Sequence, residues 1–291
     1  MSFTTAFTTL ISAAELAQHL PDNGWVILDC SHDLANPEAG RNAYAAGHLP
    51  QAQFAHLDSD LAGRKTGHDG HDGPFRGRHP LPERDVFVET LRHWGIDNDT
   101  QVVANDASGG MFAARLWWML RWVGHDAVAV LDGGLPAWQQ AGKLLTTAAP
   151  ALRRGTLTAR AALTASVDVA AVLTNLTNPA RTMLDARSPD RFRGENETLD
   201  AVGGHIPGAK NRFFKDNLQA DGRFKPAALL QTEFAALIDT PQATIVQCGS
   251  GVTACHNLLA MEVAGLPGAA LYPGSWSEWC ADPARPVATG G

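Results

Sequence analysis

Short apolar runs alternate with longer stretches of helical character along this chain, and the alternation occurs twice. Apolar runs at 26–29 and 182–185 both end in aspartate, and each is followed by a Gly-His-x-Pro turn, at 47–50 and 204–207. Strands that alternate with helices form parallel βαβ units. The pattern therefore predicts an α/β fold with two domains, each a parallel sheet flanked by helices.

A second pair of segments places a turn directly after an apolar run. The runs at 101–105 and 244–247 enter glycine-containing turns, in which Asp106 and Cys248 take the same position. Apolar residues then continue until a glycine, which is a helix stop signal. We therefore expect helices at 111–123 and 252–264.

The repeat also predicts the domain boundaries. We expect a first, non-catalytic domain over 1–145, a linker over 146–163 and a catalytic domain over 164–291. The linker is predicted because its first residues are small, polar and proline-containing.

The first half carries an insertion. His48 and Asp106 are 58 residues apart, whereas 43 residues separate His205 from Cys248. The extra residues are polar and rich in glycine and histidine, and we expect this long loop to contribute to the site of the second domain. Two histidines and two aspartates within 68–72 suggest a metal site, but the glycine between them leaves the ligands mobile. We expect a solvated loop there, with neither a metal nor a cofactor.

Composition excludes several functions. The 291 residues are 45% hydrophobic and 18% charged, which is enough for two packed domains. Lys and Arg number 23 against 30 Asp and Glu, so the net charge of −7 argues against nucleic-acid binding. The sequence has no apolar run of about eighteen residues that could span a membrane. Four scattered cysteines (Cys30, Cys248, Cys255 and Cys280) form no disulfide framework, which favours a reducing, cytoplasmic location.

Cys248 is the main candidate for chemistry. It follows a β-branched run, lies beside Gly249 and Gly251, and precedes a helix. Unpaired N–H groups at a helix start attract anions, so this position favours the thiolate form of a cysteine. Ligands of parallel sheets gather at the carboxyl ends of strands, which locates the site in the second domain. Cys255, on the same helix face, is expected to pack, and a redox partnership with Cys248 is the alternative.

These residues resemble the two-domain rhodanese-like sulfurtransferases, and the resemblance covers nearly the whole chain. It rests on the motifs at 131–134, 185–187, 204–208 and 274–279. The loop at 248–254 is similar to that of the 3-mercaptopyruvate branch, whereas thiosulfate-using members carry basic residues directly after the cysteine. A loop for a dianion gains from Arg or Lys, so this neutral loop favours a monoanionic thiol donor.

The resemblance implies tandem rhodanese-like domains and a mechanism. Cys248 would take the sulfur of 3-mercaptopyruvate as a persulfide, release pyruvate, and pass the sulfur to a thiol such as thioredoxin or to cyanide. The implied site consists of a relay of Ser250, His79 and Asp58, Arg191 for the substrate carboxylate, and the loop residues Gly249, Gly251, Val252 and Thr253.

The chain departs from that branch at one place. A second arginine is expected a few residues before Gly204, but residues 195–200 are acidic there. Arg193 or an arginine of the insertion is the possible replacement.

Three other functions compete with this assignment. A cysteine-dependent phosphatase needs an arginine that grips phosphate at the end of the loop, and this chain has Thr253 and Ala254 there, so we exclude it. The alternatives that stay open are a thiosulfate sulfurtransferase and a persulfide carrier with little small-molecule turnover.

Overall fold

The computed structural model describes residues 6–20, 22–67 and 72–291, and the chain divides into two compact units. The first unit takes the chain up to Leu61 together with Pro82–Leu163 and Leu218–Phe224. The second unit takes Ala62–Leu81, Thr164–Asn217 and Lys225–Gly291. Each unit therefore includes a segment that the sequence places between elements of the other.

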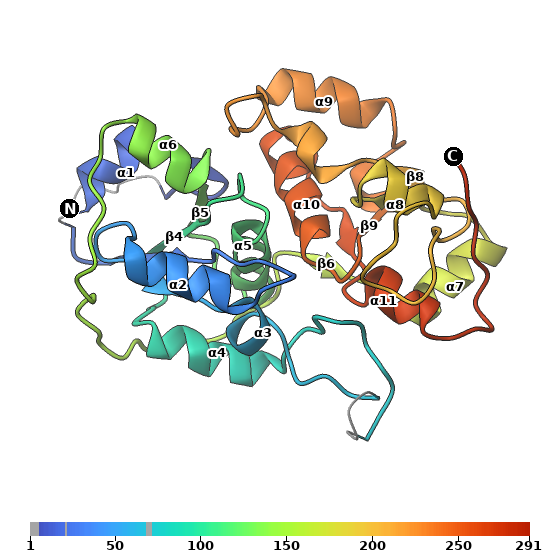
Figure 1. Ribbon diagram of the computed structural model, residues 1–291, viewed down its shortest axis with the longest axis horizontal. Coiled ribbons are helices and arrows are strands. Elements are labelled where there is room, and N and C mark those ends of the chain that lie inside the picture. Colours follow the sequence, from blue (N-terminus) through green and yellow to red (C-terminus); the bar gives the residue numbers. More distant parts are fainter. Residues whose placement is uncertain (1–5, 21, 68–71) are drawn as a thin grey trace. The chain divides into compact units, whose positions relative to one another are not determined.

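Five parallel strands form the sheet of the first unit, in the order β1-β5-β4-β2-β3. Strands β4 and β5 are labelled in Figure 1. The strands are β1 (Leu10–Ile11), β2 (Trp25–Asp29), β3 (Gln53–Phe54), β4 (Gln101–Asn105) and β5 (Val128–Leu131). The helices are α1 (Ala13–His19), α2 (Glu38–Ala46), α3 (Leu57–Asp60), α4 (Arg84–His93), α5 (Ala113–Trp122) and α6 (Gly134–Gln140). Strand β4 is central and buried at all five positions, as a parallel strand covered on both faces must be.

The second unit repeats this arrangement, with strand order β6-β10-β9-β7-β8 and parallel pairing throughout. Its strands are β6 (Ala165–Ser166), β7 (Thr182–Asp185), β8 (Lys210–Asn211), β9 (Thr244–Gln247) and β10 (Ala270–Leu271). Its helices are α7 (Val169–Thr177), α8 (Pro189–Arg193), α9 (Ala227–Ala235), α10 (Thr253–Val263) and α11 (Ser275–Cys280), with short 3-10 turns at η1 (Phe214–Asn217) and η2 (Pro241–Ala243). The predicted fold, two helix-flanked parallel sheets, is confirmed.

The two helices that follow the central strands begin later than the sequence predicted. The helix expected at 111–123 is α5, which starts at Ala113, and that expected at 252–264 is α10, which starts at Thr253. The residues before each helix form a turn instead, and in the first unit this turn wraps around the side chain of Asp106.

Asp106 directly follows the central strand of the first unit and organises the turn after it. Its side chain is fully buried, and its carboxylate accepts hydrogen bonds from the N–H groups of four residues at 2.7 to 2.9 Å: Ser108, Gly110, Phe112 and Ala113. The turn is therefore an anion site filled by the chain's own carboxylate.

The predicted linker and the insertion belong to different units. Residues 146–163 group with the first unit, where Thr146 and His48 exchange two backbone hydrogen bonds of 2.9 Å. Residues 62–81, which include most of the insertion, group with the second unit. The candidate metal ligands His68, Asp69 and His71 lie outside the described residues.

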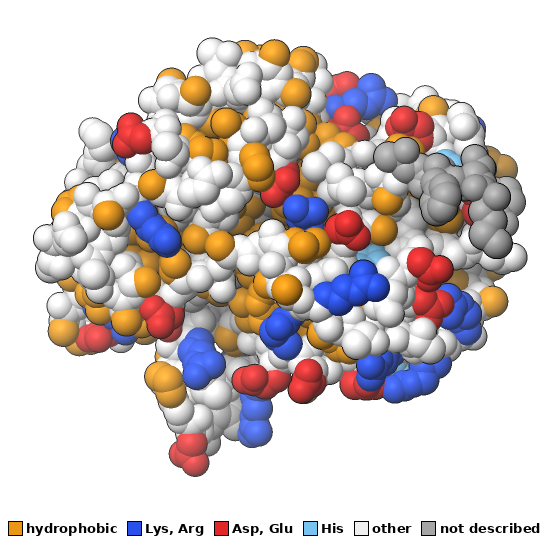
Figure 2. All heavy atoms as spheres, turned by 180° about the vertical axis from the view of Figure 1, so that it is seen from behind, with side chains coloured by type: hydrophobic (Ala, Val, Ile, Leu, Met, Phe, Trp, Pro, Cys, Tyr) orange, Lys and Arg blue, Asp and Glu red, His pale blue; other side chains and the backbone are white. Residues whose placement is uncertain are grey.

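The surface carries charges of both signs. On the face shown in Figure 2, Lys and Arg side chains are interspersed with Asp and Glu side chains. Among the helices over residues 6–20, 22–67 and 72–291, none has the length and apolar character that crossing a bilayer requires.

We expect Asp106→Ala to lower the free energy of unfolding by roughly 3 kcal/mol or more, because it leaves several buried N–H groups without an acceptor. Urea unfolding followed by circular dichroism measures the loss. Asp99→Ala, at an exposed position, is the control and should change stability by less than about 0.5 kcal/mol. Equal stability of the two variants would contradict the anchoring role of Asp106.

Candidate active site

Strand β9 delivers Cys248 to the carboxyl end of the second sheet. Residues 248–252 form the turn, Val252 caps α10, and Thr253 is the first residue of that helix. Cys248 is only 2% exposed. Its N–H donates to Oγ of Ser275 at 3.1 Å, and its carbonyl oxygen accepts from the N–H of Trp276 at 3.0 Å. The start of α11 therefore fixes the backbone of Cys248, the candidate reactive residue.

Ser275 holds this position at a conformational cost. Its φ is 54°, in the left-handed region that a residue with a Cβ rarely adopts. The hydroxyl that accepts from Cys248 also donates to the carbonyl oxygen of Tyr272 at 2.8 Å. The equivalent residue of the first unit is Gly134, with φ of 58°. The serine thus keeps the glycine geometry and adds a polar contact to the cysteine turn.

The two glycines of the cysteine turn meet different constraints. Gly251 has φ of 76°, and a Cβ added there would lie 2.4 Å from the carbonyl oxygen of Pro273. A Cβ added at Gly249 would lie 2.9 Å from Nη2 of Arg78 and 3.5 Å from Nη2 of Arg191. Gly251 is therefore required by the backbone, whereas Gly249 gives two guanidinium groups room to approach the turn.

A serine and a histidine meet beside the cysteine. Oγ of Ser250 lies 2.7 Å from Nδ1 of His79, and both residues are 5% exposed. His79 comes from the segment 62–81, whose Arg78 N–H also donates to Oγ of Ser277 at 3.1 Å. The structure therefore brings together two of the three residues predicted to form a relay.

Three arginines lie near the turn, and each is paired with carboxylates. Arg191 donates to Glu197 through Nε at 3.0 Å and through Nη2 at 2.8 Å, and its Nη2 lies 3.4 Å from Asp200. Arg78 forms an ion pair with the other oxygen of Asp200. The third arginine, Arg187, is buried and pairs with Asp185 at 2.7 Å while it stacks over Trp276. The acidic stretch that departed from the family pattern thus binds the arginines of the site.

Burial and pairing act on the two acidic side chains in opposite directions. Burial raises the pKa of Glu197, but the hydrogen bonds from Arg191 and from the N–H groups of Leu199 and Asp200, with the charge of Arg191, together outweigh it. The pKa of this carboxyl therefore lies below its ordinary value. Burial raises the pKa of Asp200 above its ordinary value despite the contact with Arg78. A cavity of about 620 Å³ lies beside the pair and is lined in part by Arg78, Asp200 and Ser277.

Of the two possible replacements for the missing arginine, only one lies at the turn. Arg193 pairs with Glu195 at 2.7 Å, and its side chain is 39% exposed. Arg78 instead lies over Gly249. An insertion arginine, and not Arg193, therefore stands next to Arg191 above the cysteine turn.

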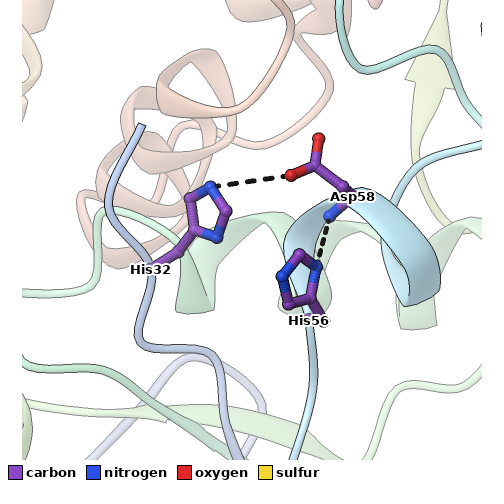
Figure 3. A group of neighbouring side chains, drawn as sticks. All are labelled: His32, His56 and Asp58. Carbon is purple, nitrogen blue, oxygen red and sulfur yellow. Dashed lines mark hydrogen bonds and ion pairs between the residues drawn. The ribbon is translucent and has the colours of Figure 1, made fainter. Parts of the chain in front are cut away.

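Asp58, the third predicted relay residue, belongs to the first unit. It lies in α3, where its carboxylate is 3.9 Å from Nε2 of His32 and its N–H donates to Nδ1 of His56 at 3.1 Å (Figure 3). Its participation in the relay stays a prediction.

These three side chains are also the group within the described residues that could hold a metal ion, since their ligand atoms lie within 4.8 Å of one another (Figure 3). His32 suits this use, because burial lowers its pKa and keeps the imidazole neutral. His56 does not. Its Nδ1 accepts the N–H of Asp58, so a neutral ring carries its proton on Nε2, and binding through Nε2 would break the cap of α3.

Sequence reasoning did not assign roles to Ser275, Glu197 or Asp200. The sequence signal that could have identified Ser275 was its alignment with Gly134 in the internal repeat. The acidic pair gave only a weak signal, because charged residues in a loop are usually solvated, whereas here both side chains are about 5% exposed or less.

Comparisons with known proteins agree on one family. Residues 12–141 and 168–282 each match the Rhodanese-like domain. A probable 3-mercaptopyruvate sulfurtransferase of Pseudomonas aeruginosa is 44% identical, over 97% of this chain and 98% of that protein. A putative thiosulfate sulfurtransferase, SseB of Mycobacterium tuberculosis, is 40% identical, over 97% of both chains. The crystal structure of SseA from Escherichia coli, described as a 3-mercaptopyruvate sulfotransferase, matches with a TM-score of 0.79 and 31% identity, over 93% of this chain and all of that one.

We expect Gly251→Ala to destabilise the protein by roughly 3 kcal/mol, because a left-handed backbone costs about 1–2 kcal/mol and the clash with Pro273 adds a similar amount. Gly265→Ala is the matched control, since Gly265 has φ of 72° but open space around its Cα. Thermal unfolding of both variants separates the clash from the backbone strain. Equal losses would show that the contact with Pro273 is unimportant.

Proposed function

This chain belongs to the rhodanese-like family, and from that premise we propose that it transfers the sulfur of 3-mercaptopyruvate to a thiol or cyanide acceptor. The transfer proceeds through a persulfide on Cys248. The observation that carries this proposal is the 2.7 Å contact of His79 with Ser250 beside Cys248, in a turn that has no basic residue of its own. The first-named relative is called a probable 3-mercaptopyruvate sulfurtransferase, which supports the same donor.

The first unit supports an anionic sulfur at Cys248. At the equivalent position, the Asp106 carboxylate accepts four N–H groups of its turn. The same strand, turn and helix surround Cys248. N–H groups at the start of α10, from Gly249 to Thr253, then stabilise a thiolate or a persulfide anion.

In the reaction, the Cys248 thiolate attacks the sulfur of the donor and forms an S–S bond. The C–S bond of mercaptopyruvate breaks, and its electron pair leaves on the pyruvate enolate. The proton of the donor thiol moves to the enolate carbon, which completes pyruvate. An acceptor thiolate then attacks the outer sulfur and regenerates the Cys248 thiolate.

Ser250 and His79 are placed to move that proton. A serine hydroxyl in contact with an imidazole can accept a proton on one side and deliver it on the other. We propose this pair as the relay, with Asp58 as its predicted third member. The donor carboxylate is bound by Arg191, and Arg78 takes the role of the missing second arginine, since both guanidinium groups lie over Gly249.

Two alternatives are separated by donor preference. The name of the Mycobacterium relative favours thiosulfate as donor. A persulfide carrier would accept sulfur from a protein and turn over neither small molecule. Both alternatives keep Cys248 as the sulfur-carrying residue.

The acceptor and the location are further proposals. A small dithiol protein such as thioredoxin suits as acceptor, because the second step needs an exposed thiolate. The four cysteines, all of them described, form no disulfide, which supports a reducing cytoplasm.

We expect mercaptopyruvate to load one extra sulfur on the wild-type protein and none on Cys248→Ser, because serine offers no thiolate. Intact-protein mass spectrometry before and after cyanide detects the added mass. Rates with the two donors at saturating cyanide test the donor. A rate with thiosulfate tenfold above that with mercaptopyruvate would reject mercaptopyruvate as the preferred donor.

We expect Ser250→Ala and His79→Ala to slow mercaptopyruvate turnover by about 10²-fold, because general acid–base groups contribute on that scale. The loss with thiosulfate should be much smaller, since thiosulfate brings no thiol proton to move. Steady-state rates with both donors provide the comparison. An equal loss with both donors would remove the relay from the mechanism.

A further inference from the structure

The arginines above the cysteine turn carry almost no surplus charge. Arg78, Arg187 and Arg191 are matched by Asp185, Glu197 and Asp200, which pair with them directly. The side chains of Glu197 and Asp200 are 4% and 5% exposed, so solvent screens these pairs weakly. A donor that approaches Cys248 therefore meets paired guanidinium groups, and not a concentration of positive charge.

The ion pair with Glu197 occupies one edge of the Arg191 guanidinium group and leaves a second edge for another ligand. Glu197 accepts from Nε and Nη2. In the described part of the chain Nη1 has no such partner, and a Cβ on Gly249 would lie 3.7 Å from Nη1 and 3.5 Å from Nη2. Nη1 is thus the open donor of Arg191. Together with Nη2, which Asp200 meets only at 3.4 Å, it forms an edge directed at the cysteine turn that can hold one carboxylate in a bidentate pair.

We propose that Glu197 and Asp200 determine donor specificity, because they offset the charge of Arg191 and Arg78 while they leave one guanidinium edge for a carboxylate. A monoanionic keto acid gains the bidentate pair. Thiosulfate brings a second negative charge, which finds the three described arginines of the turn already paired with carboxylates and is repelled by Glu197, Asp200 and the thiolate. This inference rests on the proposed function and explains how the acidic stretch at 195–200 fits a site for an anionic donor.

The test replaces Glu197 by glutamine, which keeps the size of the side chain and an oxygen that accepts from Arg191. Removing one negative charge within several ångströms of a bound anion changes its affinity on the order of tenfold. We therefore expect Glu197→Gln to raise kcat/KM for thiosulfate about tenfold relative to that for mercaptopyruvate. Asp200→Asn should change the ratio in the same direction.

Glu195→Gln is the matched control. Glu195 lies in the same segment, but it is exposed and pairs with Arg193. Its removal makes the same change in net charge and should leave the donor ratio within about twofold, since exposed charges are screened. Thermal unfolding of all three variants identifies any loss of folded protein.

An unchanged ratio of kcat/KM between the two donors in folded Glu197→Gln would overturn the proposal. An equal loss of kcat/KM with both donors would also overturn it, because it would indicate that Glu197 only holds Arg191 in place. Binding tests the proposal without turnover. In a Cys248→Ser background, calorimetry with thiosulfate and with pyruvate should show the same relative gain for thiosulfate on Glu197→Gln. If the wild type transfers sulfur from neither donor, the proposed function fails, while this binding ratio still decides the inference.

Discussion

Each unit must satisfy the backbone N–H groups that open the helix after its central strand, and the rest of the site follows from how this is done. In the first unit, Asp106 fills the turn permanently with a buried carboxylate. In the second unit, the same position holds Cys248. A sulfur can be charged, can carry a second sulfur and can give it away. In the function that we propose, this one side chain turns a structural anion site into a reactive one.

The geometry around that sulfur is set by residues that need not touch the donor. Ser275 accepts the left-handed backbone of its glycine counterpart and binds the N–H of Cys248. Glu197 and Asp200 fix the two guanidinium groups over Gly249. Electrostatic interactions gain strength in such buried places, and groups that are held in advance lose little entropy when a donor binds. The acidic residues thus orient the arginines and also limit their charge.

The sheets, the cysteine turn and the following helix were predictable because they depend on local periodicity and on the internal repeat. The place of His79 beside Ser250 came only from the family resemblance, since 171 residues separate the two. The pairing of Arg78 with Asp200 could not be predicted, because it joins positions 122 residues apart in the sequence, and an acidic loop usually points to solvent. The late start of α5 could not be predicted either, because hydrogen bonds to the buried side chain of Asp106 shape the turn before it, and periodicity does not reveal them.

The exchange of segments between the two units has a consequence for how the protein folds. The first unit includes Leu218–Phe224, in which the N–H of Phe224 donates to Asp132 at 2.8 Å, so that unit cannot be completed until about three quarters of the chain has left the ribosome. The second unit needs Ala62–Leu81, made much earlier. The two halves are repeats of one fold, yet neither unit consists of one continuous stretch of chain. A continuous fragment would therefore lack a segment of its own unit.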